Sequence, residues 1–532
     1  MIATPSFLLM GIFFVIVIAI LYLTNKANNG SLDEYAVGGR SYGPWYVAMS
    51  YTNSWWPGST YIAFMGLAAG SGVFGFYALA YSILGVTFMY LMATRAWRWG
   101  KKFDLRTQSD LIGLRFNSPT VKRIASVIGV VSLFPWLILG VQSFAALFRI
   151  GSHNSINLTV CLLLGLLVIV IRQIWTIRMG MRGLIMTDMF QGIVAYVFAA
   201  VICAVMLFGL GHSPISWSQL DTVQDTFLRV PGDGGGYGPL YLFSLIFTGV
   251  VGSLCWPTSF QRIYTASSVR SVKSGTVVTI LISGVFYTLL MLVGVAATHL
   301  QTITADPQAA WFTLMNDFGG SWVLGLAVTI VFAASMGWVD GAVQICGLQV
   351  ANDLINGGKV KRLDDRRVTH VAKLSMIGFM ILAAIGGYFT FSFDRLQLLA
   401  QVSYQGIVQL AVPLFLGIFW KKGNKQGAIA SMVSGFVIAI GLTMFFPDDI
   451  KALGSLTSGV VALAVNLLVY LVCAYAIPEK DAEKRRVEHL FAAARRSPSR
   501  SRVAVPAFPV PDPIGIPATA SVRASTVGDV TL

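Results

Sequence analysis

The chain has 532 residues, of which 55% are hydrophobic and only 11% are charged, and its mean hydropathy is +0.71. Soluble domains carry about 25% charged residues, so this composition excludes a water-soluble globule and indicates a chain solvated largely by lipid. The net charge of +15 does not indicate nucleic-acid binding, because the basic residues fall in short clusters between apolar runs rather than along one stripe.

Thirteen apolar runs are long enough to cross the hydrocarbon core, which takes about 20 residues of helix. The first, at 7–24, lacks the basic start and the small-residue cleavage site of a removed signal peptide, so we expect it to be retained as a span. The other predicted spans are 45–66, 73–94, 124–148, 156–176, 184–210, 237–258, 275–299, 320–350, 371–391, 397–420, 426–446 and 457–477.

The basic residues orient these spans. With the N-terminus outside, the outer side of the membrane holds only a few of the 38 Lys and Arg residues, namely Arg149, Arg229, Arg395 and Lys451. Lys and Arg concentrate in cytoplasmic loops, and losing or adding one span would break this alternation. The sequence therefore predicts an all-α polytopic protein of the cell (inner or plasma) membrane, with the N-terminus outside and the C-terminus inside.

Two predicted spans contain residues that interrupt a helix. The second reads NSWWPGST at 53–60 and the seventh reads GVVGSLCWPT at 249–258. Pro removes a backbone donor and Gly weakens a helix. Five spans separate the two runs, as in a five-plus-five inverted repeat whose broken first helices surround the substrate. Two ordinary kinks, relieved by neighbouring helices, are the structural alternative.

Two acidic residues lie inside predicted spans, where a charge costs a few kcal/mol and needs a partner or a function. Asp340 lies well inside the ninth span, and Asp188 lies about one turn into the sixth. Either could bind a cation or carry a proton. The alternatives are a structural pair between helices for Asp340 and, for Asp188, a favourable position near a helix start.

The sequence contains no H-E-x-x-H metal motif, and none of its histidines lies mid-span. It also shows no nucleophile–base pair and no phosphate-binding loop. We therefore expect neither an enzyme nor a cofactor, and no transition-metal site. The predicted partners are a small-molecule solute, a coupling cation (Na⁺ or H⁺) and the lipid bilayer.

Four stretches in order resemble motifs of the sodium:solute symporter family. GGRSYGPW at 38–45 is similar to its G-R-S-x-G-P motif, and 180–191, with Thr187-Asp188 and Gln191, is similar to its T-D-x-x-Q signature. The run 256–273 resembles the segment after its second broken helix, and 413–428 its late signature. The resemblance covers about residues 30–445 and implies a LeuT-like five-plus-five bundle with one extra helix before it and two after it.

This resemblance divides the chain into four parts. Residues 1–30 form the extra first helix, 31–425 the transporter core with inverted repeats at about 45–210 and 237–420, 426–477 two accessory helices, and 478–532 a cytoplasmic, basic, partly disordered tail. Within the tail, 479–496 is amphiphilic, as expected of either a segment on anionic lipid or a solvated helix.

In the family, backbone carbonyls of the first broken helix and a pair of hydroxyl residues in the ninth span hold sodium. The resemblance aligns the hydroxyl pair with Gly337-Trp338, the first-helix positions with Asn53 and Trp56, and a further carbonyl with Ala334. Gly and Trp provide no side-chain oxygen, and sodium prefers hard oxygen ligands as other hard cations do. The resemblance therefore implies a weakened sodium site.

Three explanations of this departure stay open. Asn53 and Ser335 could compensate for the lost hydroxyls, Asp188 or Asp340 could carry a proton instead, or coupling could be lost. The candidate cation-binding residues are accordingly Asn53, Trp56, Ala334, Ser335, Gly337, Asp188 and Asp340.

The region between the two predicted breaks should bind the solute. Its candidate residues are Asn53, Trp55, Ser59, Tyr77, Gln142, Ser253 and Trp256. The pattern FPW…Q at 134–142 is more similar to monocarboxylate members of the family than to proline or sugar members.

Together these features predict a secondary active transporter that imports a small polar organic solute, a monocarboxylate or an amino acid, by cation symport with sodium as the favoured ion. A proton-coupled carrier or a uniporter of the same fold is the first alternative. The second is a transporter-like membrane sensor, since some relatives fuse such a core to signalling modules.

Overall fold

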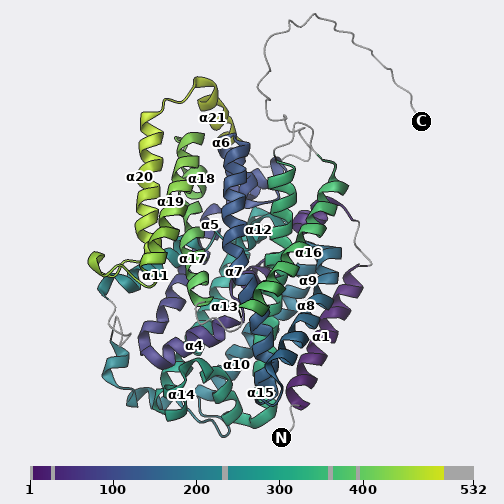
Figure 1. Ribbon diagram of the computed structural model, residues 1–532, viewed down its shortest axis with the longest axis vertical. Coiled ribbons are helices and arrows are strands. Elements are labelled where there is room, and N and C mark those ends of the chain that lie inside the picture. The colour runs from purple at the N-terminus through teal and green to yellow at the C-terminus, as the bar shows by residue number, and fades with distance from the viewer. Residues whose placement is uncertain (1–3, 26–29, 230–237, 358–362, 391–395, 496–532) are drawn as a thin grey trace, which may run out of the picture.

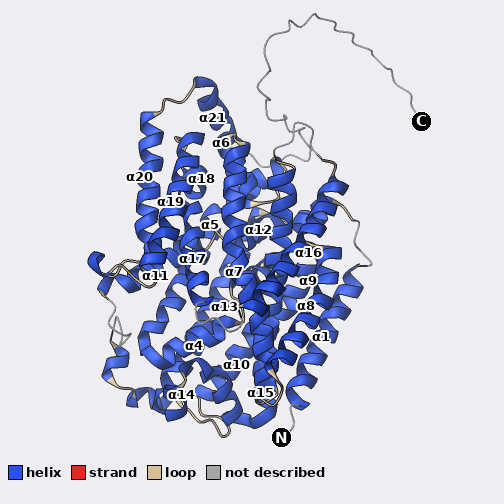
Figure 2. Cartoon of the chain, in the orientation of Figure 1, coloured by secondary structure: helices blue, strands red, loops and turns tan. Residues whose placement is uncertain are grey.

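The computed structural model is a bundle of helices that run mostly along its long axis (Figures 1 and 2). It describes the whole chain except residues 1–3, 26–29, 230–237, 358–362, 391–395 and 496–532. Within the described ranges there is no β-strand, only two isolated bridges. The all-α class predicted from the sequence is confirmed.

The first half of the bundle follows the N-terminal helix α1 (Thr4–Asn25) and the short α2 (Leu32–Val37). It consists of α3 (Pro44–Trp55), α4 (Ser59–Ser71), α5 (Tyr77–Lys102), α6 (Gln108–Phe116), α7 (Pro119–Gly151), α8 (Leu158–Met179), α9 (Met181–Gly192) and α10 (Phe198–Leu207). A π-helical turn, Ile193–Val197, joins α9 to α10.

The second half repeats this order. It consists of α11 (Pro239–Gly252), α12 (Pro257–Thr265), α13 (Val269–Ala296), α14 (Gln301–Ala305), α15 (Ala310–Gln349), α16 (Asp365–Phe389), α17 (Leu396–Ile407) and α18 (Gly417–Phe419), with a π-helical turn at Val412–Leu416. Each half thus has a broken helix, a long helix, a short helix with a long one, another long helix and a helix with a π-helical turn. This repetition fits the predicted five-plus-five plan.

Both predicted helix breaks are confirmed. α3 ends at Trp55 and α4 begins at Ser59, while α11 ends at Gly252 and α12 begins at Pro257. Proline has no N–H to continue the helical bonding, and its fixed φ suits the first turn of a new helix. The residues before the two prolines, Trp56 and Trp256, have extended or nearly extended conformations.

Twelve helical segments of the described chain are long and apolar enough to cross a membrane. One of them, Ser59–Lys102, bends at Gly72, whose φ of +61° interrupts the helix, and so contains residues 59–66 of the second predicted span and all of the third. The earlier part of the second predicted span lies in the separate helix α3, which has 12 residues. The start of α1 and the helix α21 lie at opposite ends of the long axis (Figure 1), which fits an odd number of crossings. The count of thirteen and the orientation stay predictions.

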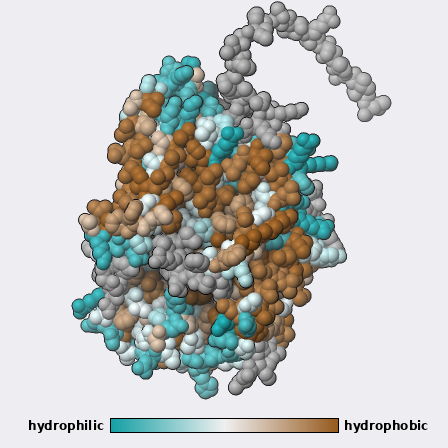
Figure 3. Space-filling model, in the orientation of Figure 1, coloured by the Kyte–Doolittle hydropathy of each residue, from teal (hydrophilic) through white to brown (hydrophobic). Residues whose placement is uncertain are grey.

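The outer helices present apolar side chains to their surroundings. α1 and α16 are largely exposed, whereas α15 is buried along most of its length and forms the centre of the bundle. Hydrophobic residues cover the middle of the face in Figure 3, and hydrophilic residues gather at its two ends. Side chains such as Leu281 and Val437, both 62% exposed, are therefore placed to contact lipid.

Helices α19 (Lys425–Phe445) and α20 (Ser458–Ala476) form a packed pair over the range predicted for the two accessory helices, and their accessory role stays a prediction. The last described helix, α21 (Asp481–Arg495), covers the amphiphilic part of the tail. Its apolar face is packed on α5, where Trp99 Nε1 donates to the Leu490 carbonyl at 2.9 Å. The structure thus binds this segment to the bundle itself. The rest of the predicted tail lies outside the described residues.

Candidate functional site

The first helix break presents two tryptophans. Trp55 ends α3, and Trp56 follows in an extended conformation. Their rings stack with centroids 5.2 Å apart, and the ring of Trp56 meets Tyr287 edge-on at 5.2 Å. The Trp56 carbonyl accepts a hydrogen bond from the Tyr196 hydroxyl at 2.8 Å. A peptide group that the break frees from helical bonding is therefore satisfied by a side chain from the π-helical turn.

The second break lies beside the first. Ser253, which follows α11, donates through Oγ to the Gly85 carbonyl of α5 at 3.1 Å. A Cβ atom at Gly85 would lie 2.8 Å from the Trp55 ring and 2.9 Å from Ser253 Cβ. Only glycine fits here, because residues of both breaks pack against the same point of α5. The structure therefore brings Trp55 and Ser253 together.

A second group of aromatic rings begins at Trp256, directly before α12. Its ring packs edge-on against Trp136 of α7 at 6.3 Å and tilted against Tyr404 of α17 at 5.9 Å. Trp136 in turn contacts Trp338 of α15 at 6.3 Å. Four helices of the core thus meet through rings at this break.

The remaining candidate solute residues divide into two sets. Tyr77 stacks on Tyr81 at 5.9 Å, and Tyr81 meets the Trp55 ring at 5.8 Å. Ser59, the half-buried first residue of α4, lies at the same break. Gln142 lies elsewhere, because its Nε2 donates to side-chain and backbone oxygens at the end of α16, at 3.2 and 3.5 Å. Its role in solute binding stays a prediction that these contacts do not favour.

Asn53 fills the space beside Gly337. A Cβ atom at Gly337 would lie 2.7 Å from Asn53 Nδ2 and 3.1 Å from Gln191 Oε1. Asn53 Nδ2 donates to both the backbone oxygen and Oδ1 of Asp188 at 3.3 Å. The amide nitrogen of Asn53 therefore lies between Gly337 and Asp188.

Two further candidate cation residues lie on α15. Ala334 is fully buried, and Ser335 is 3% exposed. Ser335 Oγ has no hydrogen-bond partner among the described residues, and it packs against Gly58, where a side chain would collide with it. The missing side chain at Gly58 lets the start of α4 approach α15 closely.

Asp188 is held by a buried arginine. Arg262 Nη2 of α12 lies 3.4 Å from Asp188 Oδ2, and both side chains are fully buried. Ser50 Oγ donates to the same oxygen at 2.5 Å and accepts from Arg262 Nε at 2.9 Å. The predicted signature acid therefore joins α3, α9 and α12.

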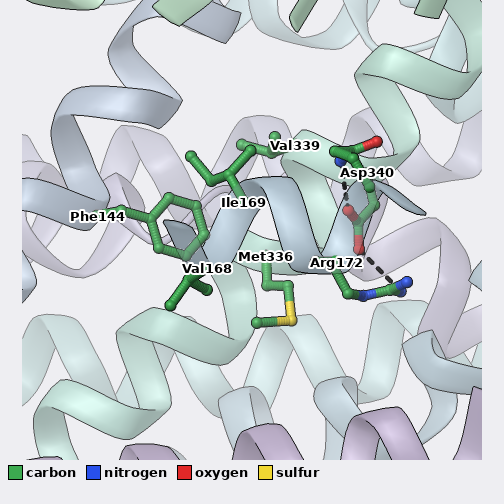
Figure 4. A pocket seen from close by; sticks show the side chains of 8 residues that line it. Phe144, Val168, Ile169, Arg172, Met336, Val339 and Asp340 are labelled. Atoms are coloured by element: carbon green, nitrogen blue, oxygen red, sulfur yellow. Dashed lines mark hydrogen bonds and ion pairs between the residues drawn. The ribbon is translucent and has the colours of Figure 1, made fainter. Parts of the chain in front are cut away.

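Asp340 is held in the same way by Arg172 of α8. Arg172 Nη2 lies 2.8 Å from Asp340 Oδ2, with both side chains 1% exposed, and Gln173 Nε2 donates to Asp340 Oδ1 at 2.7 Å. Figure 4 shows this pair together with side chains of α7, α8 and α15, which leave a gap too narrow for a water molecule. The arrangement matches the interhelical pair that the sequence left open for Asp340.

The two pairs form one group, which we call the central cluster: Asp188, Arg262, Asp340 and Arg172. Arg172 Nη2 also donates to Thr187 Oγ1 at 2.8 Å, directly beside Asp188. A Cβ atom at Gly341, next to Asp340, would lie 3.2 Å from Arg262 Nη2. The sequence interpretation found both acids but neither base. The signal was present, because Arg172 is a charged residue inside an apolar run and a charge at that depth needs a partner.

Three or more His, Cys, Asp or Glu side chains do not come together as a metal site anywhere in the described part of the chain. The site therefore offers neutral peptide groups, hydroxyls and rings at the breaks, and paired charges in the central cluster. Such an arrangement can bind a small polar solute and control ion access.

Comparison with known proteins gives one consistent result. The family model described as "Sodium:solute symporter family" matches residues 35–435. An uncharacterized symporter, YhjB, of Bacillus subtilis (strain 168) is 24% identical over 86% of this chain and 95% of its own. A monocarboxylate transport permease protein of Rhizobium johnstonii is 21% identical over 84% of this chain and 91% of its own. A solved Na⁺-coupled sialic acid symporter in its substrate-bound outward-open state matches with a TM-score of 0.74 and 14% identity, covering 90% of this chain and 98% of its own.

Proposed function

Because the chain belongs to the sodium:solute symporter family, we propose that it is a secondary transporter that imports a small monocarboxylate or amino acid together with a monovalent cation. Proteins of this family are integral plasma-membrane transporters and not enzymes. The fold is LeuT-like, as its structural relatives are.

The observation that carries the proposal is the meeting of the two helix breaks. Trp55 and Ser253 pack against the same glycine of α5, although they lie far apart in the sequence. A break inside a membrane leaves peptide groups without helical partners, and such groups are tolerated where they are buried in protein or line a cavity. In transporters with repeated halves, the solute binds between such breaks near the middle of the bilayer.

Two features support a carboxylate-bearing solute. The starts of α4 and α12 direct backbone N–H groups toward the breaks, and a helix start can bind an anion without a basic side chain. One relative of similar length is named a monocarboxylate transport permease. The tryptophan rings at both breaks provide the apolar surface that packs against the rest of a small organic acid.

A proton-coupled carrier or a uniporter of this fold is the second candidate. It is favoured by Gly337 and Trp338, which stand where the family has a hydroxyl pair. The alternative of another class is a membrane sensor that binds the solute without moving it. These candidates differ in whether the solute crosses the membrane and in which ion gradient drives it, so one transport assay separates them.

The test is uptake by purified protein in proteoliposomes. A panel of radiolabelled carboxylates and amino acids is supplied under an imposed sodium gradient and, separately, an imposed pH gradient. We expect at least one solute to accumulate under one of the gradients. Equal uptake with and without both gradients would favour a uniporter, and binding without uptake of any solute would favour the sensor and contradict the proposal.

Two variants test the location of the solute site. We expect Trp56→Ala, which removes the stacking partner of Trp55, and Ser253→Trp, which places an indole in the fully buried space beside Gly85, to abolish uptake at normal membrane levels. Trp322→Ala is the matched control, because that ring is 59% exposed on α15. Wild-type uptake by both site variants would contradict this location.

A further inference from the structure

The central cluster is electrically balanced. It contains two carboxylates and two guanidinium groups, and none of the four side chains is more than 1% exposed. Each acid faces one base on a neighbouring helix: Asp188 of α9 faces Arg262 of α12, and Asp340 of α15 faces Arg172 of α8. An additional cation would therefore meet no net negative charge here, and it would add an uncompensated charge among fully buried side chains, which is costly.

Three of the four carboxylate oxygens also accept hydrogen bonds from neutral donors. Asp188 accepts from Ser50 Oγ and Asn53 Nδ2, and Asp340 Oδ1 accepts from Gln173 Nε2. Asp340 Oδ2 has no hydrogen-bond donor among the described residues and faces Arg172 alone. A metal ion bound to either acid would therefore have to displace one of these donors or an arginine.

The space beside Gly337 offers little to a sodium ion. The Asn53 group nearest to it is the amide nitrogen, which donates hydrogen bonds and repels a cation. Two buried amide oxygens nearby, Asn53 Oδ1 and Gln191 Oε1, have no hydrogen-bond partner among the described residues, and neither has Ser335 Oγ, two positions before Gly337. Three neutral side-chain oxygens are fewer than a hard cation normally takes from its site.

We propose that Arg262 and Arg172 act as tethered cations that replace a bound sodium ion, so that the protein binds and moves its solute without sodium. The transport half of this statement rests on the proposed function, whereas the ion-binding half does not. The two arginines neutralise and position the neighbouring acids, and in this way they determine which ion the acids can accept. In this role the arginines themselves do not contact the solute.

The first test is the melting temperature of the purified wild-type protein in NaCl, KCl and choline chloride at equal ionic strength. A ligand that binds the folded state raises this temperature with its concentration. We expect the three titrations to coincide, and uptake of any transported solute to be equal in sodium and choline. A saturable rise specific to sodium would overturn the proposal, and its loss in Gln191→Leu would place the ion at the amide oxygens.

The second test converts the cluster into a cation site. Arg262→Gln leaves Asp188 without its base, so we expect sodium to raise the melting temperature of this variant by about 3 °C or more at saturation. Arg262→Gln combined with Asp188→Asn restores balance and should lose the response. A folded Arg262→Gln variant with no sodium response would contradict the tethered-cation role.

A matched control separates this effect from the general loss of a buried base. Arg115 of α6 is also fully buried, but its guanidinium donates to backbone carbonyls, those of Gly417 and Lys421, at 3.1 and 2.6 Å. Arg115→Gln should lower stability without any sodium response. If Arg262→Gln does not fold, the wild-type titration still decides the proposal. Failure of every solute to be transported would contradict the proposed function and leave the ion titrations valid.

Discussion

Two buried clusters of charged side chains join the helices of this protein in different ways. The central cluster pairs two acids with two arginines, and its other partners are side chains and the helix carbonyls of Asp188 and Thr258. A second group, which we call the end cluster, consists of Asp110 of α6, Lys122 of α7 and Asp353 after α15. Here one lysine serves two acids, at 2.5 Å from Asp110 Oδ1 and 3.2 Å from Asp353 Oδ1.

The end cluster has one base for two acids, and backbone N–H groups stabilise the additional negative charge. Asp110 Oδ2 accepts from the N–H groups of Arg106 and Thr107 at 2.9 and 3.2 Å. Burial raises the pKa of Asp110. The Lys122 ammonium and the hydrogen bond from the Arg106 backbone together lower it by more, so the pKa of Asp110 lies below its ordinary value. Asn352 Nδ2 donates to both acids, at 2.9 and 2.7 Å.

The difference follows from position along the helices. The end cluster lies where α6 and α7 begin, and the first turn of a helix has free N–H groups and a partial positive charge. The central cluster lies mid-helix, where backbone N–H groups are already bonded, so only side chains can neutralise its acids. Position along the helix therefore decides whether a buried acid requires a full positive charge of its own.

The largest effect should come from Lys122→Met, which removes the one base of the end cluster. Two buried carboxylates then lose their charge partner, and breaking a buried ion pair costs about 3–5 kcal/mol. We expect a loss of unfolding free energy at the upper end of this range, measured by SDS titration in mixed micelles.

Adding Asp353→Asn to Lys122→Met should recover part of this loss, because the remaining acid keeps its backbone donors. Lys480→Met provides the control, since Lys480 is exposed and forms no ion pair with an acid of the described chain. An unfolding free energy of Lys122→Met equal to that of the wild type would contradict this prediction. It would mean that neutral donors alone stabilise both acids of the end cluster, so that this cluster does not depend on its base.

A smaller loss is expected from Arg172→Gln in the central cluster. Only one acid loses its base, and Gln173 still donates to Asp340, so the cost should be about 3 kcal/mol. The double variant Arg172→Gln with Asp340→Asn should be more stable than the single one, because no unpaired charge is left. A double-mutant cycle in which the two losses simply add would show that the pair is not coupled.

Much of the fold was predictable from the sequence because lipid simplifies the pattern. A span must be apolar for about 20 residues, and Pro257 or Gly58 in such a run is conspicuous. What the pattern could not provide is the end of each helix. α15, for example, starts ten residues before the predicted span, because a kink at Gly319 and Gly320, the latter with φ +62°, interrupts the helix without ending it.

The position of the candidate site residues was predictable only in part. The structure places Trp55, Ser253 and Trp256 at the helix breaks, as expected from the prolines and glycines in the same runs, and their role in solute binding stays a prediction. The partners of Asp188 and Asp340 were missed, because pairing between residues separated by 74 and by 168 positions depends on how helices pack, which one sequence does not display. Gln142 was chosen by similarity of a motif, and the structure places its amide on α16 instead.

The smallest effect should come from Arg486→Ala on α21, which tests whether the tail supports the end cluster. Arg486 donates to the carbonyls of Leu114 and Arg115 at the end of α6, at 3.1 and 2.6 Å, and α6 carries Asp110. Hydrogen bonds to a charged donor at a partly exposed site are worth about 1–2 kcal/mol in total. We expect that loss in the wild-type background and almost none when Lys122→Met has already weakened the end cluster. Equal losses in both backgrounds would mean that α21 stabilises α6 independently of the cluster, and Lys484→Ala, an exposed lysine on the same helix, should leave both values unchanged.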